Sequence, residues 1–183
     1  MKLNIPNILT LLRLFMIPVF VGLFYTPWQW AFMAAAILFV VASLTDALDG
    51  YLARRLNQST PFGAFLDPVV DKLMVATALV MLVEHYDNGL VTLASIIMIG
   101  REIVISALRE WMAEMGKRGI VAVSWLGKFK TGAQMTAITG LIAQYNDLIT
   151  NISLVLLYVA TFLTIWSMLS YIRAAWADLT RHG

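Results

Sequence analysis

The stretch LFMIPVFVGLFYTPWQWAFMAAAILFVVASLT, residues 14–45, decides the fold because it contains no charged side chain. A helix needs about 20 apolar residues to cross a bilayer, so this run is too long for one span and short for two. Pro27 lies inside it beside two tryptophans; proline ends helices, and tryptophan favours the membrane–water interface. We therefore predict a helical hairpin whose two spans cover residues 8–25 and 28–53.

The composition of the 183-residue chain is typical of an integral membrane protein. Hydrophobic residues make up 60% and charged residues 13%, against about 45–50% and about 25% in soluble domains, and the mean hydropathy is +0.78. So little polar surface excludes a soluble globule and a disordered chain. Cysteine is absent and only two histidines are present, which excludes a disulfide framework and argues against a zinc centre. A net charge of +2 argues against nucleic acid as a partner.

The remaining apolar runs complete an all-α bundle of six transmembrane helices, in a single membrane domain over residues 1–183 that is surrounded by lipid. The other four predicted spans cover residues 68–83, 90–115, 123–144 and 148–172. Basic residues occur in the loops on the side of the termini, whereas the three opposite loops contain no lysine or arginine. Because basic loops stay on the cytoplasmic side, we predict that both termini are cytoplasmic.

Four aspartates lie where the second and third predicted spans meet. They belong to the pattern D-x2-D-G-x2-A-R-x8-G-x3-D-x3-D, in which they are Asp46, Asp49, Asp67 and Asp71. Spacings of three and four residues put each pair on one helix face, and the short linking loop makes the two helices antiparallel neighbours. We therefore expect the four carboxylates to converge near the cytoplasmic membrane surface.

Four clustered carboxylates need neutralisation, because ionisable groups within a span are costly. Two divalent cations would balance their charge, and the hard oxygen ligands favour Mg²⁺ or Mn²⁺. Two such ions at a lipid-facing site suggest a diphosphate substrate, which Arg54 can contact and which Gly50 and Gly63 leave room for. Two alternatives stay open: an ion or proton relay, and Asp67 as the N-cap of a helix that starts at Pro68.

The aspartate pattern resembles, at all eight fixed positions, the signature of the CDP-alcohol phosphotransferases. That family also has six spans with the motif across the second and third, so the resemblance covers the whole chain. Four further segments are similar to bacterial members that make phosphatidylglycerophosphate: residues 4–13, 101–102, 108–109 and 127–131. The resemblance implies an enzyme that transfers the phosphatidyl group of CDP-diacylglycerol to sn-glycerol 3-phosphate and releases CMP. It also implies a homodimer in the bacterial inner membrane with its active site facing the cytoplasm.

The same resemblance implies the roles of individual residues. A two-metal centre is held by Asp46, Asp49, Asp67 and Asp71. Asp71 is in addition the expected general base. The matched positions that bind CDP-diacylglycerol are Asn7, Thr10, Gly50, Arg54, Thr60 and Gly63.

Four basic residues indicate which alcohol accepts the phosphatidyl group. Arg101 and Arg109 lie on the predicted fourth span, and Lys128 and Lys130 lie at the start of the fifth. Cations that face a cavity suggest an acceptor with its own phosphate, as in glycerol 3-phosphate. The alternative for the arginines is pairing with nearby glutamates such as Glu102, and inositol phosphate is the nearest rival acceptor. Cardiolipin-type chemistry, an ion-coupled transporter and a prenyltransferase also remain, although the chain has one aspartate motif and no internal repeat.

Overall fold

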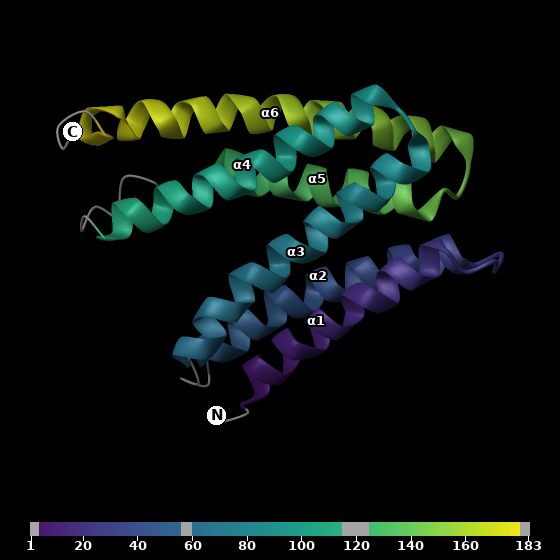
Figure 1. The fold of residues 1–183 in the computed structure, drawn as a ribbon, viewed down its shortest axis with the longest axis horizontal. Coiled ribbons are helices and arrows are strands. Elements are labelled where there is room, and N and C mark those ends of the chain that lie inside the picture. Colours follow the sequence, from purple (N-terminus) through teal and green to yellow (C-terminus); the bar gives the residue numbers. More distant parts are fainter. Residues whose placement is uncertain (1–3, 56–59, 115–124, 180–183) are drawn as a thin grey trace. The chain divides into compact units, whose positions relative to one another are not determined.

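A computed structural model of the chain describes residues 4–55, 60–114 and 125–179, and its regular elements there are all α-helices (Figure 1). The six described helices are α1 (Ile5–Phe24), α2 (Ala31–Arg55), α3 (Pro61–Tyr86), α4 (Gly89–Glu114), α5 (Trp125–Ala143) and α6 (Asp147–Leu179). The predicted all-α architecture is therefore confirmed, and each helix overlaps one predicted span.

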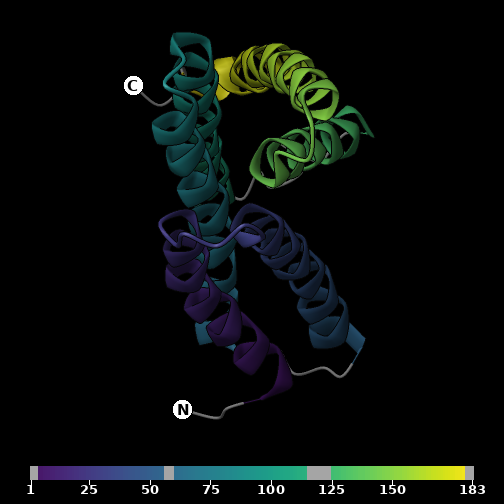
Figure 2. The same cartoon turned by 90° about the vertical axis from the view of Figure 1, so that its right-hand side faces the viewer.

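The hairpin predicted from residues 14–45 is formed by α1 and α2, which a short turn joins (Figures 1 and 2). Asn4 caps α1, because its side chain accepts a hydrogen bond from the backbone N–H of Asn7 at 3.2 Å. Pro6 follows in the first turn, where its missing N–H costs nothing. Pro27 lies in the turn between the helices, as its position among the tryptophans predicts.

Aromatic and small side chains pack α1 against α2. The ring of Phe20 lies 5.2 Å from that of Phe24 and 6.2 Å from that of Phe39, while the rings of Phe24 and Phe32 are 5.5 Å apart. Among the side chains of α2 that the structure describes, the buried alanines are Ala31, Ala35, Ala36 and Ala42. Small residues let helices approach closely in a bilayer, so close packing stabilises this pair.

α3 starts at Pro61, earlier than the predicted span at residue 68. The hydroxyl of Thr60 accepts a hydrogen bond from the backbone N–H of Gly63 at 3.0 Å and so caps the helix. Pro68 therefore lies inside α3, and the alternative that Asp67 is an N-cap is wrong. The physical reason is that Thr60-Pro61 is also a capping residue followed by a proline at N1, and it comes first along the chain.

Contacts divide the chain into two compact units, which are described separately. The first comprises residues 1–85 and 139–150, and the second comprises residues 86–138 and 151–183. The first unit contains the helices α1 and α2 and nearly all of α3. In the second unit, α4 and α6 meet at a buried methionine, Met112, which packs against Leu108, Trp111 and Tyr171.

Three of the described helices contain segments long and apolar enough to cross a membrane: Asn7–Phe24, Gly89–Met112 and Asp147–Arg173. α2 contributes a shorter apolar segment, Ala31–Asp46. Many large apolar side chains on these helices are exposed, among them Phe15, Ile37, Ile96, Phe162 and Trp166. Lipid covers such a surface in a membrane protein, which is the class of protein this chain belongs to. The number of six spans stays a prediction.

Candidate active site

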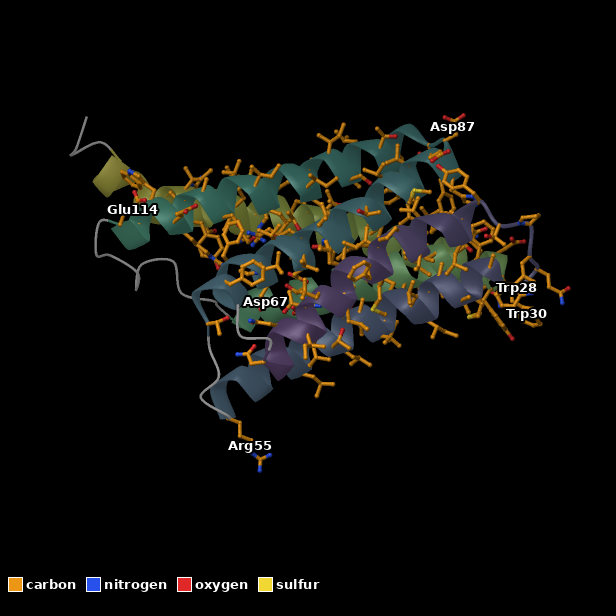
Figure 3. All side chains as sticks on the ribbon, turned by 60° about the horizontal axis from the view of Figure 1, so that its bottom comes forward. Trp28, Trp30, Arg55, Asp67, Asp87 and Glu114 are labelled. Atoms are coloured by element: carbon orange, nitrogen blue, oxygen red, sulfur yellow. The ribbon has the colours of Figure 1, made fainter. Side chains whose placement is uncertain are left out.

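The described side chains bring together the carboxylates of Asp46 on α2 and Asp67 on α3. Both accept hydrogen bonds from one guanidinium, that of Arg13 on α1. Its Nη1 contacts Oδ1 of Asp46, and its Nη2 lies 3.0 Å from Oδ1 of Asp67. Within this unit, Figure 3 shows Asp67 toward the end that carries Arg55, whereas Trp28 lies at the other end. The first and third aspartates of the pattern therefore share one site built by three helices.

The guanidinium is buried, whereas the two carboxylates are partly accessible. The side chain of Arg13 is 1% exposed, and those of Asp46 and Asp67 are each 36% exposed. A buried arginine needs anionic partners, and these two supply them. The accessible part of each carboxylate offers hard oxygen ligands of the kind that Mg²⁺ and Mn²⁺ bind. The donor set therefore fits a divalent metal ion.

The other two predicted metal ligands are Asp49 and Asp71, and only the side chain of Asp71 is among those described. Asp71 lies one helical turn beyond Asp67 on α3 and is partly buried, and the side chain of Asp49 lies outside the described set. Among the side chains that the structure describes, no three carboxylates or imidazoles are close enough to hold a metal ion. The structure thus brings together Asp46 and Asp67, while the metal-binding role of all four aspartates stays a prediction.

Three of the predicted CDP-diacylglycerol positions form one cluster between α1 and α3. Nδ2 of Asn7 donates a hydrogen bond to Oγ1 of Thr60 at 3.0 Å, and the same hydroxyl caps α3 through Gly63. A Cβ atom at Gly63 would overlap Oδ1 of Asn7 and lie 3.1 Å from Oγ1 of Thr60. Glycine at this position therefore leaves room for the side chains of Asn7 and Thr60. Thr10, one turn beyond Asn7 on α1, is also buried.

Comparison with known proteins decides the family. The sequence profile of the family described as CDP-alcohol phosphatidyltransferase matches residues 3–166. The chain belongs to this family. The resemblance inferred from the aspartate pattern is therefore confirmed.

Several relatives that share the same name match the chain over nearly its whole length. The CDP-diacylglycerol–glycerol-3-phosphate 3-phosphatidyltransferase of Yersinia pestis (strain Pestoides F) is 58% identical over 179 residues, which is 98% of each chain. The enzyme of that name from Sodalis glossinidius (strain morsitans) is 56% identical over 182 residues and 100% of each chain. A third, from Shigella flexneri serotype 5b (strain 8401), is 57% identical over 179 residues and 98% of each chain.

Arg13 is the residue of this CDP-alcohol phosphatidyltransferase site that the sequence analysis missed. In the sequence it is the one charged residue between Lys2 and Asp46. An ionisable residue inside an apolar helix is by default a candidate for a functional site, so a signal was present. Its partners lie 33 and 54 residues away along the chain, and no local spacing indicates them. Members of this family use divalent metal ions, and Arg13 contacts two of the predicted ligands.

The predicted acceptor cations that the structure describes lie in the second unit. Nη1 of Arg101 contacts Oε1 of Glu102, so the alternative of glutamate pairing holds for this arginine. Nε of Arg101 is buried and has no hydrogen-bond partner among the described residues, and Arg109 is exposed. The predicted site residues whose side chains lie outside the described set are Asp49, Gly50, Arg54, Lys128 and Lys130. A shared phosphate pocket therefore stays a prediction.

Proposed function

We propose that this protein transfers the phosphatidyl group of CDP-diacylglycerol to sn-glycerol 3-phosphate, forming phosphatidylglycerophosphate and CMP. The observation that carries the proposal is the pairing of Asp46 and Asp67 on one buried guanidinium. This pair occurs in a chain that matches enzymes named for that reaction over 98–100% of its length. The reaction is a step of phospholipid biosynthesis.

The proposed metal centre consists of two divalent ions, Mg²⁺ or Mn²⁺, held by Asp46, Asp49, Asp67 and Asp71. When bound, such ions neutralise the negative charge on the phosphoryl oxygens and on the leaving group. The proposed residues that bind the lipid nucleotide are Asn7, Thr10, Gly50, Arg54, Thr60 and Gly63. The hydrogen-bonded cluster of Asn7, Thr60 and Gly63 supports this assignment, because it holds three of the six positions together.

Asp71 is the proposed general base. It accepts the proton of the acceptor hydroxyl while the oxygen of that hydroxyl forms a bond to the lipid-side phosphorus. The bond from this phosphorus to the oxygen of CMP breaks, and CMP leaves with the electron pair. The proton that Asp71 has accepted then passes to water, which returns the carboxylate for the next turnover.

The proposed membrane arrangement has six spans, both termini in the cytoplasm and the active site on the cytoplasmic side of the bacterial inner membrane. Arg55 supports this orientation, because it is exposed and lies toward the same end of its unit as Asp67 (Figure 3). Basic residues next to a span favour the cytoplasmic side. A homodimer is the proposed assembly, on the basis of the family resemblance.

The acceptor is tested with a panel of alcohols. Purified protein in detergent, with CDP-diacylglycerol and Mg²⁺, should release CMP with glycerol 3-phosphate and release very little with glycerol or inositol phosphate. A chelator should abolish CMP release, and added Mg²⁺ or Mn²⁺ should restore it, because uncompensated aspartates repel a diphosphate. Greater activity with inositol phosphate would contradict the acceptor assignment alone. Full activity after exhaustive metal removal would contradict the metal centre.

A further inference from the structure

The guanidinium of Arg13 joins two helices by holding one carboxylate from each. One Nη atom contacts Asp46, and the other lies 3.0 Å from Asp67. Both of these contacts use the Oδ1 atom of the carboxylate. The planar fork of arginine presents its donors in fixed directions and stays charged at every accessible pH. Arg13 therefore fixes the orientation of both carboxylates and compensates one of their two negative charges.

We infer that Arg13 is a positioning residue, which orients Asp46 and Asp67 so that their accessible oxygens bind the metal ions. This inference rests on the proposed function, because it requires that these aspartates are metal ligands. The exposed fractions carry it: 1% for the arginine and 36% for each aspartate. An ion that reaches the accessible part of the carboxylates does not need to displace a guanidinium buried away from solvent.

The opposite role would be that of a competitor, a cation that occupies the place of the metal ion. The two roles predict changes of opposite sign. Removing a competitor strengthens metal binding, because one positive charge leaves the site. Removing a positioning residue weakens it, because hydrogen-bond partners of metal ligands typically contribute a factor of about 10–100 to metal affinity. The burial of Arg13 favours the second outcome.

The experiment measures binding of Mn²⁺ alone to the full-length, metal-free protein in detergent, through the electron paramagnetic resonance signal of free Mn²⁺. Arg13→Lys keeps the positive charge but loses the planar guanidinium that donates to both carboxylates, and Arg13→Gln loses the charge. Both variants should bind Mn²⁺ about 10–100-fold more weakly than the wild type. The matched control is Arg55→Lys, which changes an exposed arginine of the same unit and should bind Mn²⁺ as the wild type does.

A second measurement separates positioning from a purely structural role. CMP release by Arg13→Lys, followed against Mn²⁺ concentration, should reach half its maximum at about 10–100-fold higher Mn²⁺, with most of the saturating rate recovered. A purely structural role would lower the saturating rate and leave the half-saturating concentration unchanged. The wild type and Arg55→Lys supply the reference curves.

Each further outcome has a distinct meaning. Unchanged or tighter Mn²⁺ binding by folded Arg13→Lys would overturn the inference and leave the proposed function intact. Failure of both variants to fold, judged by size-exclusion chromatography, would also overturn it, because Arg13 would then act in folding. The proposed function itself fails differently: either the wild type binds no Mn²⁺, or Asp46→Asn and Asp67→Asn bind it as tightly as the wild type.

Discussion

The first unit, which contains α1, α2 and nearly all of α3, has one polar contact between helices toward each end, and the two contacts differ in how deeply they are buried. Toward one end, the buried guanidinium of Arg13 holds Asp46 and Asp67. Toward the other end, the hydroxyl of Tyr25 donates a hydrogen bond to Oε2 of Glu84 at 2.7 Å, and Tyr25 is 63% exposed. Both contacts join helices, but only the first contains a buried charged group, the guanidinium of Arg13.

The difference shows that burial decides the consequence of losing a polar contact. Removing one partner of a buried ion pair leaves an uncompensated charge and costs about 3–5 kcal/mol, whereas an exposed contact exchanges its partner for water. Packing holds the exposed end instead, for example through the rings of Phe32 and His85, which are 5.0 Å apart. Substitutions at the aspartate end should therefore alter function strongly, and substitutions at the Tyr25 end should be tolerated.

The largest expected effect is that of Asp71→Asn. Because an amide cannot accept the proton, the rate of CMP release should fall about 10²–10⁴-fold, while binding of CDP-diacylglycerol is largely kept. The matched control is Asp87→Asn in the turn after α3, where φ is 43°, a conformation that asparagine tolerates. That variant should keep the wild-type rate. Equal losses of binding and turnover in Asp71→Asn would make Asp71 chiefly a metal ligand.

Arg109→Ala tests whether an exposed residue can still be important for function. Arg109 is exposed, and it is proposed to bind the phosphate of glycerol 3-phosphate. Hydrogen bonds to charged groups are worth about 1.5–3 kcal/mol, so the KM for glycerol 3-phosphate should rise tens-fold, with little change in the KM for CDP-diacylglycerol. Lys130→Ala should behave alike. The melting temperature of Arg109→Ala should stay unchanged, because the side chain is exposed. Arg173→Ala, an exposed arginine of α6, is the control, and an unchanged acceptor KM in both proposed-site variants would contradict the pocket.

Gly63→Ala should have a smaller effect, on stability. The added Cβ overlaps Oδ1 of Asn7, which is held by Thr60, and overpacking of this kind costs about 1–3 kcal/mol. The melting temperature in detergent should therefore fall. Gly22→Ala on α1 is the matched control, because a Cβ there meets nothing within 4 Å. If both alanine variants melted at the same temperature, the α1–α3 contact would not be as tight as the structure has it.

Helix positions could be predicted from the sequence because the spacing of charges and apolar runs is a local property. The start of α3 could not, since Thr60-Pro61 and Asp67-Pro68 both fit a helix start; in the structure Thr60 caps the helix and also accepts a hydrogen bond from Asn7. The aspartate pattern identified the family, and the carboxylates of Asp46 and Asp67 both contact Arg13, whereas the convergence of all four aspartates stays a prediction. Arg13 was missed because its partners are distant along the chain, and such contacts arise only when the helices pack.

The smallest expected effect is that of Tyr25→Phe. The hydrogen bond to Glu84 raises the pKa of Tyr25 above its ordinary value of 10.0, because the ionised phenol could not donate to a carboxylate. A group with a raised pKa in the folded state contributes stability below its unfolded pKa and loses it as the pH rises through the folded value. The contact is therefore complete at neutral pH and is lost only above pH 10.0.

At neutral pH the melting temperature of Tyr25→Phe should match that of Tyr145→Phe, which removes a hydroxyl from another exposed tyrosine. In a titration of phenolate absorbance, the tyrosine that Tyr25→Phe lacks should ionise above pH 10.0. A fall in melting temperature as large as that of Gly63→Ala would break the comparison between the two ends. It would mean that an exposed hydrogen bond holds α1 to α3 as firmly as the buried contacts do.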